Sequence, residues 1–265
     1  MNRLIKLSIL SLALFAVTEG AFAFGGCGEG SCVDCHSLSK EQAQEAIAPL
    51  GLTAEVIEVK LSKVPGLWSI AVFDKRNNKK IPLYIDYSKK YLIQGDVVEI
   101  ATRESLTRMT MAELNRVNTD DIPLDDALVL GSPKAKFKVI VFDDPECPFC
   151  KKFQEEMKKV VAKRSDIAFY IKMLPLKIHP KARAKAEAII CAKSLELLDK
   201  TLAGEEIPAA TCKTDQIDKN EALAAKLDIR STPTFIVPDG RVFPGARSAE
   251  DVIKFVDSPL PPLKK

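Results

Sequence analysis

The sequence predicts an α+β protein built from two unlike domains and preceded by an export signal. Three observations lead to this prediction. In residues 127–265, apolar strand-like runs alternate with helical patterns, whereas in residues 39–102 one helical pattern is followed only by strand-like runs. The first 23 residues have the layout of a secretory signal peptide. Residues 24–265 then remain, which is enough for two domains of ordinary size.

The export signal is indicated by charge and hydropathy. Arg3 and Lys6 precede an apolar run from Leu7 to Val17, and the tripeptide AFA that ends at Ala23 is typical of a signal-peptidase site. We therefore expect cleavage near Ala23 and an exported protein. Lipidation of Cys27 is the alternative, but the apolar run ends well before that residue.

Charge and cysteine content bound the chemistry. The formal net charge is +3 with both signs mixed along the chain, so no basic surface for nucleic acid is expected. All seven cysteines follow the signal peptide, and an exported chain is expected to form disulfides. Because seven is odd, the cysteines cannot all pair within one chain.

Residues 24–126 contain a leader, a small domain and a linker. The Gly-rich leader, residues 24–38, carries the motif CVDCH. Residues 37–51 are expected to form a helix that starts at Ser39 as N-cap, and the runs AEVIEVKL, GLWSIAVFD, KKIPLYIDY and KKYLIQGDVVEI read as strands. A unit of about 60 residues is near the lower limit of independent stability. Helical spacing then predicts a linker helix within residues 103–126.

Residues 127–265 form the second domain around the motif CPFC. The run from Phe137 to Phe142 predicts a buried strand, and a helical pattern follows the cysteine pair. IAFYIKMLPL predicts another strand, residues 179–204 one long helix, and residues 215–227 a further helix. STPTFIVPDGRVFPG predicts two strands joined by an Asp-Gly turn, and Ser248 begins the last helix.

A C-x-x-C pair between a strand and a helix is typical of thioredoxin-like redox chemistry. The helix N-terminus lowers the pKa of Cys147, so we expect this residue to be the exposed, attacking thiolate. Cys150, one turn later, is expected to face inward and to resolve the mixed disulfide. The alternatives are a structural disulfide or half of a zinc site, but zinc needs two more ligands and the chain has only two histidines.

Four stretches carry a resemblance to a known family. FDDPECPFC, IICAK at 189–193, TC at 211–212 and STP at 231–233 resemble the DsbC/DsbG-type periplasmic protein-disulfide isomerases of the thioredoxin superfamily, from about residue 40 to the end. The resemblance implies a C-terminal thioredoxin fold with a helical insertion. It also implies a cis-proline at Pro233, with the backbone of Thr232 facing the cysteine pair, and a structural disulfide between Cys191 and Cys212. Two free thiols are the alternative to that disulfide.

The resemblance extends to assembly and also has a limit. YIDYSKKYLIQG, residues 84–95, resembles the hairpin of the DsbC dimerisation domain, which implies a homodimer formed through a small N-terminal α+β domain. The Pro-Phe dipeptide between the catalytic cysteines departs from the Gly-Tyr of DsbC and is nearer the Pro-Tyr of DsbG. The redox potential and the balance between isomerase and chaperone therefore stay open.

These features predict a thiol-disulfide oxidoreductase or isomerase that needs no cofactor. Its expected partners are unfolded or misoxidised exported proteins, a membrane thiol electron donor and a second copy of the chain. The motif CVDCH supports an alternative, because Cys32 and Cys35 could attach haem c covalently with His36 as the iron ligand. The protein would then be a haem-bearing electron carrier or redox sensor. A plain disulfide or redox pair in the leader and a cytochrome-maturation thioredoxin-like reductase are further alternatives.

Overall fold

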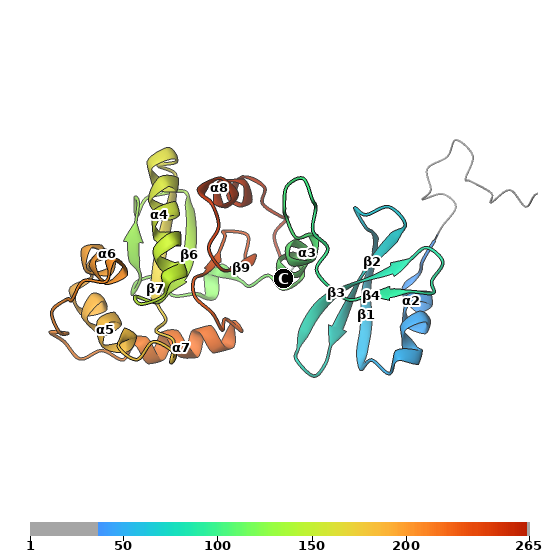
Figure 1. Cartoon of the computed structure of the whole chain (residues 1–265), viewed down its shortest axis with the longest axis horizontal. Helices are drawn as coiled ribbons and strands as arrows, with labels where there is room; N and C mark the ends of the chain where they lie inside the picture. The colour runs from blue at the N-terminus through green and yellow to red at the C-terminus, as the bar shows by residue number, and fades with distance from the viewer. Residues whose placement is uncertain (1–36, 264–265) are drawn as a thin grey trace, which may run out of the picture.

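The computed structural model describes residues 37–263, which form two domains side by side with helix α3 (Leu106–Leu114) between them (Figure 1). Each domain has its own sheet and its own buried apolar core. The predicted α+β class is confirmed. The predicted signal peptide, Cys27 and the CVDCH motif lie outside the described residues. Within residues 37–263, no helix is long and apolar enough to cross a membrane.

The N-terminal domain is a four-stranded antiparallel sheet, ordered β1-β2-β3-β4, with helix α2 packed on one face. Ser39 caps α2 in a capping box with Gln42, an arrangement worth about 1 kcal/mol. Ala43 and Ile47 of α2 are buried together with Trp68 and Ile70 of β2. The elements are α2 (Lys40–Ile47), η1 (Ala48–Leu50), β1 (Ala54–Leu61), β2 (Leu67–Asp74), β3 (Lys79–Asp86) and β4 (Leu92–Ile93).

The fourth strand is much shorter than the sequence predicts. Only Leu92 and Ile93 pair with β3, and a single bridge joins Val98 to Ser105 farther on. The remainder of the run KKYLIQGDVVEI is irregular because Gly95 and Asp96 interrupt it. As a result, several apolar side chains after β3 remain on the surface, among them Tyr91 and Ile100.

The C-terminal domain has a five-stranded mixed sheet, ordered β5-β7-β6-β8-β9. The central strands β6 and β7 are parallel, and the other neighbours are antiparallel. The strands are β5 (Leu128–Leu130), β6 (Phe137–Asp143), β7 (Ile167–Met173), β8 (Thr234–Ile236) and β9 (Val242–Pro244). The helices are α4 (Pro148–Lys163), α5 (Ala182–Ala192), α6 (Leu195–Ala203), α7 (Gln216–Lys226) and α8 (Ala249–Asp257), with the short η2 (Thr119–Asp121) before β5.

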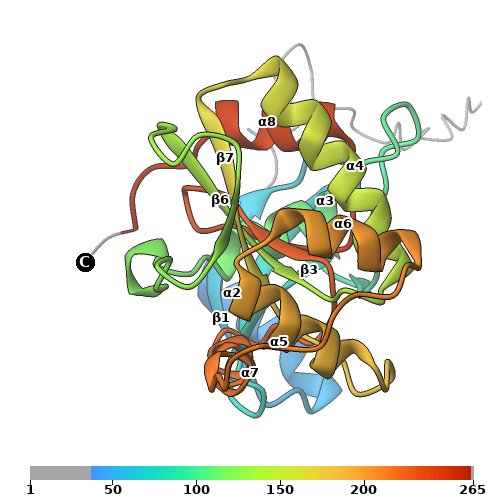
Figure 2. The same ribbon diagram turned by 90° about the vertical axis from the view of Figure 1, so that its left-hand side faces the viewer.

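Both faces of this sheet are covered, so its central strand is buried on both sides. Val139 and Val141 of β6 point to the main core formed with α4 and α8, whereas Ile140 and Phe142 point to the core beneath α7. This alternation follows from the two-residue period of a strand. Figure 2 shows α4 and α8 on one side of β6 and β7 and α7 on the other.

The long helix predicted for residues 179–204 is wrong, because the structure divides it into α5 and α6. Lys193 adopts a left-handed conformation, and the Ser194 side chain accepts a hydrogen bond from the Leu197 N–H to cap α6. A serine cap competes with continuous helix in this way because it satisfies a free N–H of a new first turn. The three-residue strand β5 also has no counterpart in the sequence prediction.

The chain between the domains is held to the C-terminal domain by two hydrogen bonds to main-chain oxygens, one from a main-chain N–H and one from a side chain. The Val117 N–H donates to the Gly240 oxygen at 2.9 Å, and Arg116 donates to the Pro261 oxygen at 2.7 Å. A Cβ atom on Gly240 would lie 2.0 Å from the Val117 oxygen, and Gly240 has a φ of +89°. Only glycine therefore fits this turn. Across the domains, Lys79 also forms an ion pair with Asp228.

Candidate active site

The cysteine pair lies where β6 passes into α4. The Cys147 N–H donates to the Asp144 oxygen at 3.1 Å, which closes a tight turn between strand and helix. Cys147 is the N-cap of α4, and Pro148 occupies the first helical position, where its missing N–H would have had no partner. Cys147 therefore sits at the helix N-terminus, Cys150 lies one turn along, and both are free thiols.

Several groups stabilise the ionised form of Cys147. Its pKa is lowered to about 5, chiefly by a hydrogen bond from the Cys150 thiol. The N–H groups of Cys150 and Phe149 in the first turn of α4 act in the same direction, and burial opposes them. A thiol with this pKa is a thiolate at neutral pH, and the thiolate is the form that attacks disulfides.

The second cysteine has the opposite character. Cys150 is wholly buried, and burial is the main reason that its pKa is raised, with the neighbouring Asp143 carboxylate acting in the same direction. It therefore keeps its proton and can donate it to Cys147. Burial likewise raises the pKa of Asp143 to about 7, and its interaction with the Cys150 thiol offsets only part of this rise.

The segment before β8 completes the site. The Thr232–Pro233 peptide bond is cis, and the Cys147 sulfur lies 3.4 Å from the Thr232 carbonyl oxygen, to which it donates when it is protonated. The Thr232 side chain is buried beside Cys147 and helps to lower the pKa of that thiol. The site thus places main-chain and side-chain polar groups of Thr232 beside the sulfur that reacts.

Cys147 is less exposed than we expected from the sequence. Only 5% of its surface is accessible, because the Thr232 segment, 85 residues away in the chain, covers it. The residue nevertheless lines a hollow of about 270 Å³ between the start of α4 and the end of α6. An ion pair between Lys185 and Glu146, at 2.9 Å, forms part of the wall.

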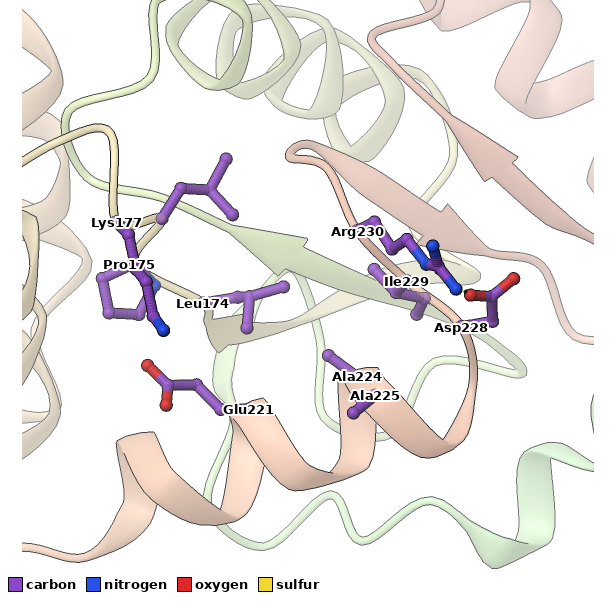
Figure 3. A pocket seen from close by; sticks show the side chains of 10 residues that line it. Leu174, Pro175, Lys177, Glu221, Ala224, Ala225, Asp228, Ile229 and Arg230 are labelled. Atoms are coloured by element: carbon purple, nitrogen blue, oxygen red, sulfur yellow. Dashed lines mark hydrogen bonds and ion pairs between the residues drawn. The ribbon is translucent and has the colours of Figure 1, made fainter.

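A second hollow, of about 360 Å³, lies between the loop after β7, helix α7 and residues 228–230 (Figure 3). Leu174, Ala224 and Ile229 give it an apolar floor, and charged residues of both signs surround it. Among these, Asp228 accepts from Arg230 at 2.6 Å. Arg230 lies two residues before Thr232, so this hollow borders the segment that carries the cis bond.

The other two cysteines described in this domain come more than 40 residues after Cys147 and Cys150 in the sequence. Cys191, in the last turn of α5, is joined to Cys212 in the loop before α7, with their Cα atoms 5.6 Å apart. The bond ties the segment that contains α6 to the end of α5. Cys191 and Cys212 carry no free thiol and therefore cannot take part in exchange in this form.

We next asked which described residues could bind a metal ion or haem iron. Within residues 37–263, no three His, Cys, Asp or Glu side chains cluster in a way that could hold a metal ion. The candidate haem ligands Cys32, Cys35 and His36 lie outside these residues.

Three residues near the thiols escaped the sequence prediction. Asp143 and Asp144 end β6 and begin the turn to Cys147, and His179 comes from the loop after β7 to contact Asp144. The acidic pair in FDDPEC was a visible signal. Carboxylates directly before a thiolate disfavour its negative charge, so their presence there calls for an explanation. His179 gave no such signal, because its approach depends on the folded loop.

The fold and the paired thiols define a thioredoxin-fold protein with a dithiol site at a helix N-terminus. Residues 124–258 match the thioredoxin-like domain family, and residues 36–108 match the N-terminal domain of disulfide bond isomerase proteins. The chain belongs to the thioredoxin-like family and carries this isomerase-type N-terminal domain. The predicted relationship to the DsbC/DsbG-type proteins is confirmed.

Individual relatives agree with the family matches. The probable thiol:disulfide interchange protein DsbC of Bordetella avium is 28% identical over 157 residues, which cover 59% of this chain and 55% of the relative. The thiol:disulfide interchange protein DsbC of Dickeya dadantii is 26% identical over 69% of this chain and 75% of its own length. The first of these matches therefore spans little more than half of the relative.

The solved structures that are similar to this protein match about half of its chain. A disulfide interchange protein from Neisseria gonorrhoeae is 27% identical, with a TM-score of 0.45 over 51% of this chain and 96% of its own. The catalytic domain of Proteus mirabilis ScsC is 20% identical, with a TM-score of 0.44 over 57% of this chain and 96% of its own.

Proposed function

We propose that this protein is a periplasmic thiol-disulfide oxidoreductase and isomerase that reduces or reshuffles wrong disulfides in exported proteins. One observation carries the proposal: the two thiols are held in opposite states. Cys147 has a pKa of about 5 and is ionised, whereas burial keeps the proton on Cys150. This asymmetry suits a reaction in which one sulfur attacks and the other waits.

The reaction begins when the Cys147 thiolate attacks one sulfur of a substrate disulfide. A bond forms between Cys147 and that sulfur, the substrate S–S bond breaks, and the other substrate sulfur leaves as a thiolate that takes a proton from water. The cis segment at Thr232 and Pro233 is the edge against which we place an extended substrate chain, as in strand addition.

The mixed disulfide then has two outcomes. In isomerisation, another substrate thiolate attacks the bonded substrate sulfur, and Cys147 leaves unchanged. In reduction, Cys150 passes its proton to the Asp143 carboxylate and attacks the Cys147 sulfur, which releases a reduced substrate and leaves a Cys147–Cys150 disulfide. Asp143 suits this proton transfer because its pKa, about 7, lies near the working pH. A membrane thiol electron donor would return the two electrons.

The working form that we propose is a homodimer joined through the N-terminal domains, with residues 39–102 as the dimerisation domain and 127–265 as the catalytic domain. The open edge of the N-terminal sheet at β4 supports this arrangement. Tyr91 and Ile93 expose 68% and 40% of their surfaces at this strand, and Val98 and Ile100, in the irregular segment after it, expose 48% and 94%. An exposed apolar edge of this kind is a site for pairing with another chain. Two catalytic domains facing a shared space would hold a misfolded chain while its bonds exchange.

Refolding of scrambled ribonuclease tests the proposal, together with reduction of insulin by the pre-reduced protein. The full exported chain should restore ribonuclease activity, and Cys147→Ser should not. Failure of the pre-reduced full chain in both assays would contradict the proposal. The haem-bearing carrier and the cytochrome-maturation reductase are not favoured, since the isomerase-type N-terminal domain is present. A visible spectrum after expression with a cytochrome c maturation system checks the haem alternative, for which a Soret band would be diagnostic.

A further inference from the structure

A histidine beside the redox pair has no part in the reaction described above. His179 lies in the loop between β7 and α5, and its Nδ1 atom is 2.8 Å from the Asp144 Oδ2 atom. Asp144 is fully buried, whereas the His179 side chain retains 19% of its exposure. One edge of the imidazole is thus fixed inside the protein, and the residue as a whole remains accessible to water.

The Asp144 carboxylate is held rigidly by its other contacts. Its Oδ1 atom accepts from the Glu146 N–H at 2.8 Å, and Oδ2 also accepts from the Leu176 N–H at 2.7 Å. The main chain of the same residue accepts from the Cys147 N–H and donates to the Cys150 sulfur at 3.4 Å. Asp144 therefore joins the loop of His179 to the turn that carries both catalytic thiols.

The contact with Asp144 selects the tautomer of the neutral imidazole. Because Asp144 accepts at Nδ1, that nitrogen carries a hydrogen, and Nε2 is left to gain or lose a proton. The hydrogen bond to Asp144 is the main reason that the pKa of His179 is raised, and the charges of Cys147 and Glu146 raise it further, against the effect of burial. Glu146 is itself paired with Lys185 of α5 at 2.9 Å.

The attraction between His179 and Cys147 works in both directions. If a thiolate at Cys147 favours the protonated imidazole, the protonated imidazole favours the thiolate by the same free energy. We propose that the Asp144–His179 pair is a positioning device that keeps a positive charge near Cys147 and so favours its attacking, ionised form. This inference rests on the proposed function, since it assigns a task within the same reaction.

A purely structural role would be to anchor the loop through the Nδ1 hydrogen bond. His179→Asn separates the two roles, because an asparagine amide can donate from about the position of Nδ1 but carries no charge. His179→Ala removes both the hydrogen bond and the charge. Lys177→Gln is the matched control, because it removes a cation from the same loop at the wall of the hollow in Figure 3.

The measurement is the pH dependence of the Cys147 thiolate in the reduced full chain, followed by absorbance at 240 nm and by the rate of alkylation with iodoacetamide. For His179→Asn we expect the titration midpoint to rise by about one pH unit, so that alkylation slows about tenfold at pH values below both midpoints. Lys177→Gln should follow the wild type. Far-UV circular dichroism and melting temperature establish that each variant is folded.

The outcomes separate the inference from the proposed function. An unchanged midpoint in folded His179→Asn overturns the inference, as does an equal shift in Lys177→Gln. If His179→Ala is unfolded, His179→Asn still decides. A wild-type chain that reduces insulin while His179→Asn keeps the wild-type titration contradicts only the role of His179. A wild-type chain without a thiol of low pKa contradicts the proposed function itself.

Discussion

The carboxylate of Asp143 and the thiol of Cys150 interact inside the C-terminal domain, at the junction of β6 and α4. Apart from the Cys150 thiol and the Asp144 N–H, the carboxylate oxygens have no hydrogen-bond partner within residues 37–263, and 1% of Asp143 is accessible to solvent. A buried carboxyl that is so poorly solvated costs folding free energy whenever it is ionised. The position of the Asp143 carboxyl beside the Cys150 thiol is consistent with the proton transfer that we propose between them.

Asp143→Asn is expected to stabilise the protein at neutral pH and to slow resolution by Cys150. The folded-state pKa of Asp143 is raised from 3.8 to about 7, so between these pH values the folded state binds more protons than the unfolded state. The contribution of Asp143 to the unfolding free energy therefore falls as pH rises through this window. A shift of about three units corresponds to on the order of 4 kcal/mol.

Chemical denaturation at pH 4 and at pH 7.5 measures the stability effect. The gain in unfolding free energy of Asp143→Asn over the wild type should be larger at pH 7.5. Single-turnover release of a bound model peptide measures the rate of resolution. Equal stability gains at the two pH values would show that the Asp143 carboxyl titrates normally in the folded protein.

The two catalytic cysteines should respond differently to substitution by serine. Cys147→Ser removes the attacking sulfur and should abolish both reduction and isomerisation. Cys150→Ser leaves attack possible but removes resolution by the second thiol, so a mixed disulfide with substrate should accumulate. Non-reducing electrophoresis and mass spectrometry detect this species. Identical behaviour of the two variants would reverse or abolish the assignment of roles.

Removing the disulfide between Cys191 and Cys212 should lower stability and leave the thiol chemistry intact. The bond closes a segment of 21 residues, and loss of such a native disulfide typically costs about 2–5 kcal/mol. The double variant Cys191→Ala/Cys212→Ala avoids a leftover thiol and is compared with the wild type by denaturant unfolding. Loss of insulin reduction in the folded double variant would show a role beyond structure.

A shortened chain that begins at Asp125 should be monomeric and should still reduce small disulfides. It retains the five-stranded sheet, the site and most of the buried cores of the C-terminal domain, and it lacks Ala112 and Ile122 from those cores. We expect it to lose most of its ability to refold scrambled ribonuclease, because the shared space of the dimer is absent. Size-exclusion chromatography with light scattering gives the oligomeric state. Equal isomerisation by the short and full chains would contradict the need for a dimer.

A point substitution in the full chain checks the same surface without truncation. Ile100→Asp places a charge on the most exposed large apolar residue described, so it should weaken dimerisation with little effect on the fold. Lys134→Asp, on the surface of the C-terminal domain, is the control and should leave the dimer intact. An unchanged dimer in Ile100→Asp would place the interface elsewhere.

The sequence was most informative where chemistry and local structure coincide. The strand before Asp143, the helix that begins at Pro148 and the caps at Ser39 and Ser248 follow from residue spacing and short-range hydrogen bonds. Local signals of this kind act within a few residues, so a sequence displays them directly. The arrangement of Cys147 between strand and helix could therefore be predicted in detail.

Features that depend on distant segments could not be predicted in this way. The burial of Cys147 comes from Thr232, 85 residues later, and the contact of His179 with Asp144 crosses 35 residues. The break between α5 and α6 involves Lys193 in a left-handed conformation without a glycine or proline to announce it. The first two features are decided by tertiary packing, which overrides local preference, whereas the break also depends on the local cap at Ser194.

The junction between Val117 and Gly240 has a mechanical consequence. The hydrogen bond joins main-chain atoms, and the Val117 oxygen leaves no room for a Cβ atom at Gly240, so this contact holds the linker to the catalytic domain together with the side chain of Arg116. In a dimer, each catalytic domain would be attached at this junction. A small rotation there would therefore move the reacting sulfurs by a larger distance. The distance between the two Cys147 thiolates, and therefore the size of the substrate protein that both can contact, would then depend on Gly240, a residue that has no side chain.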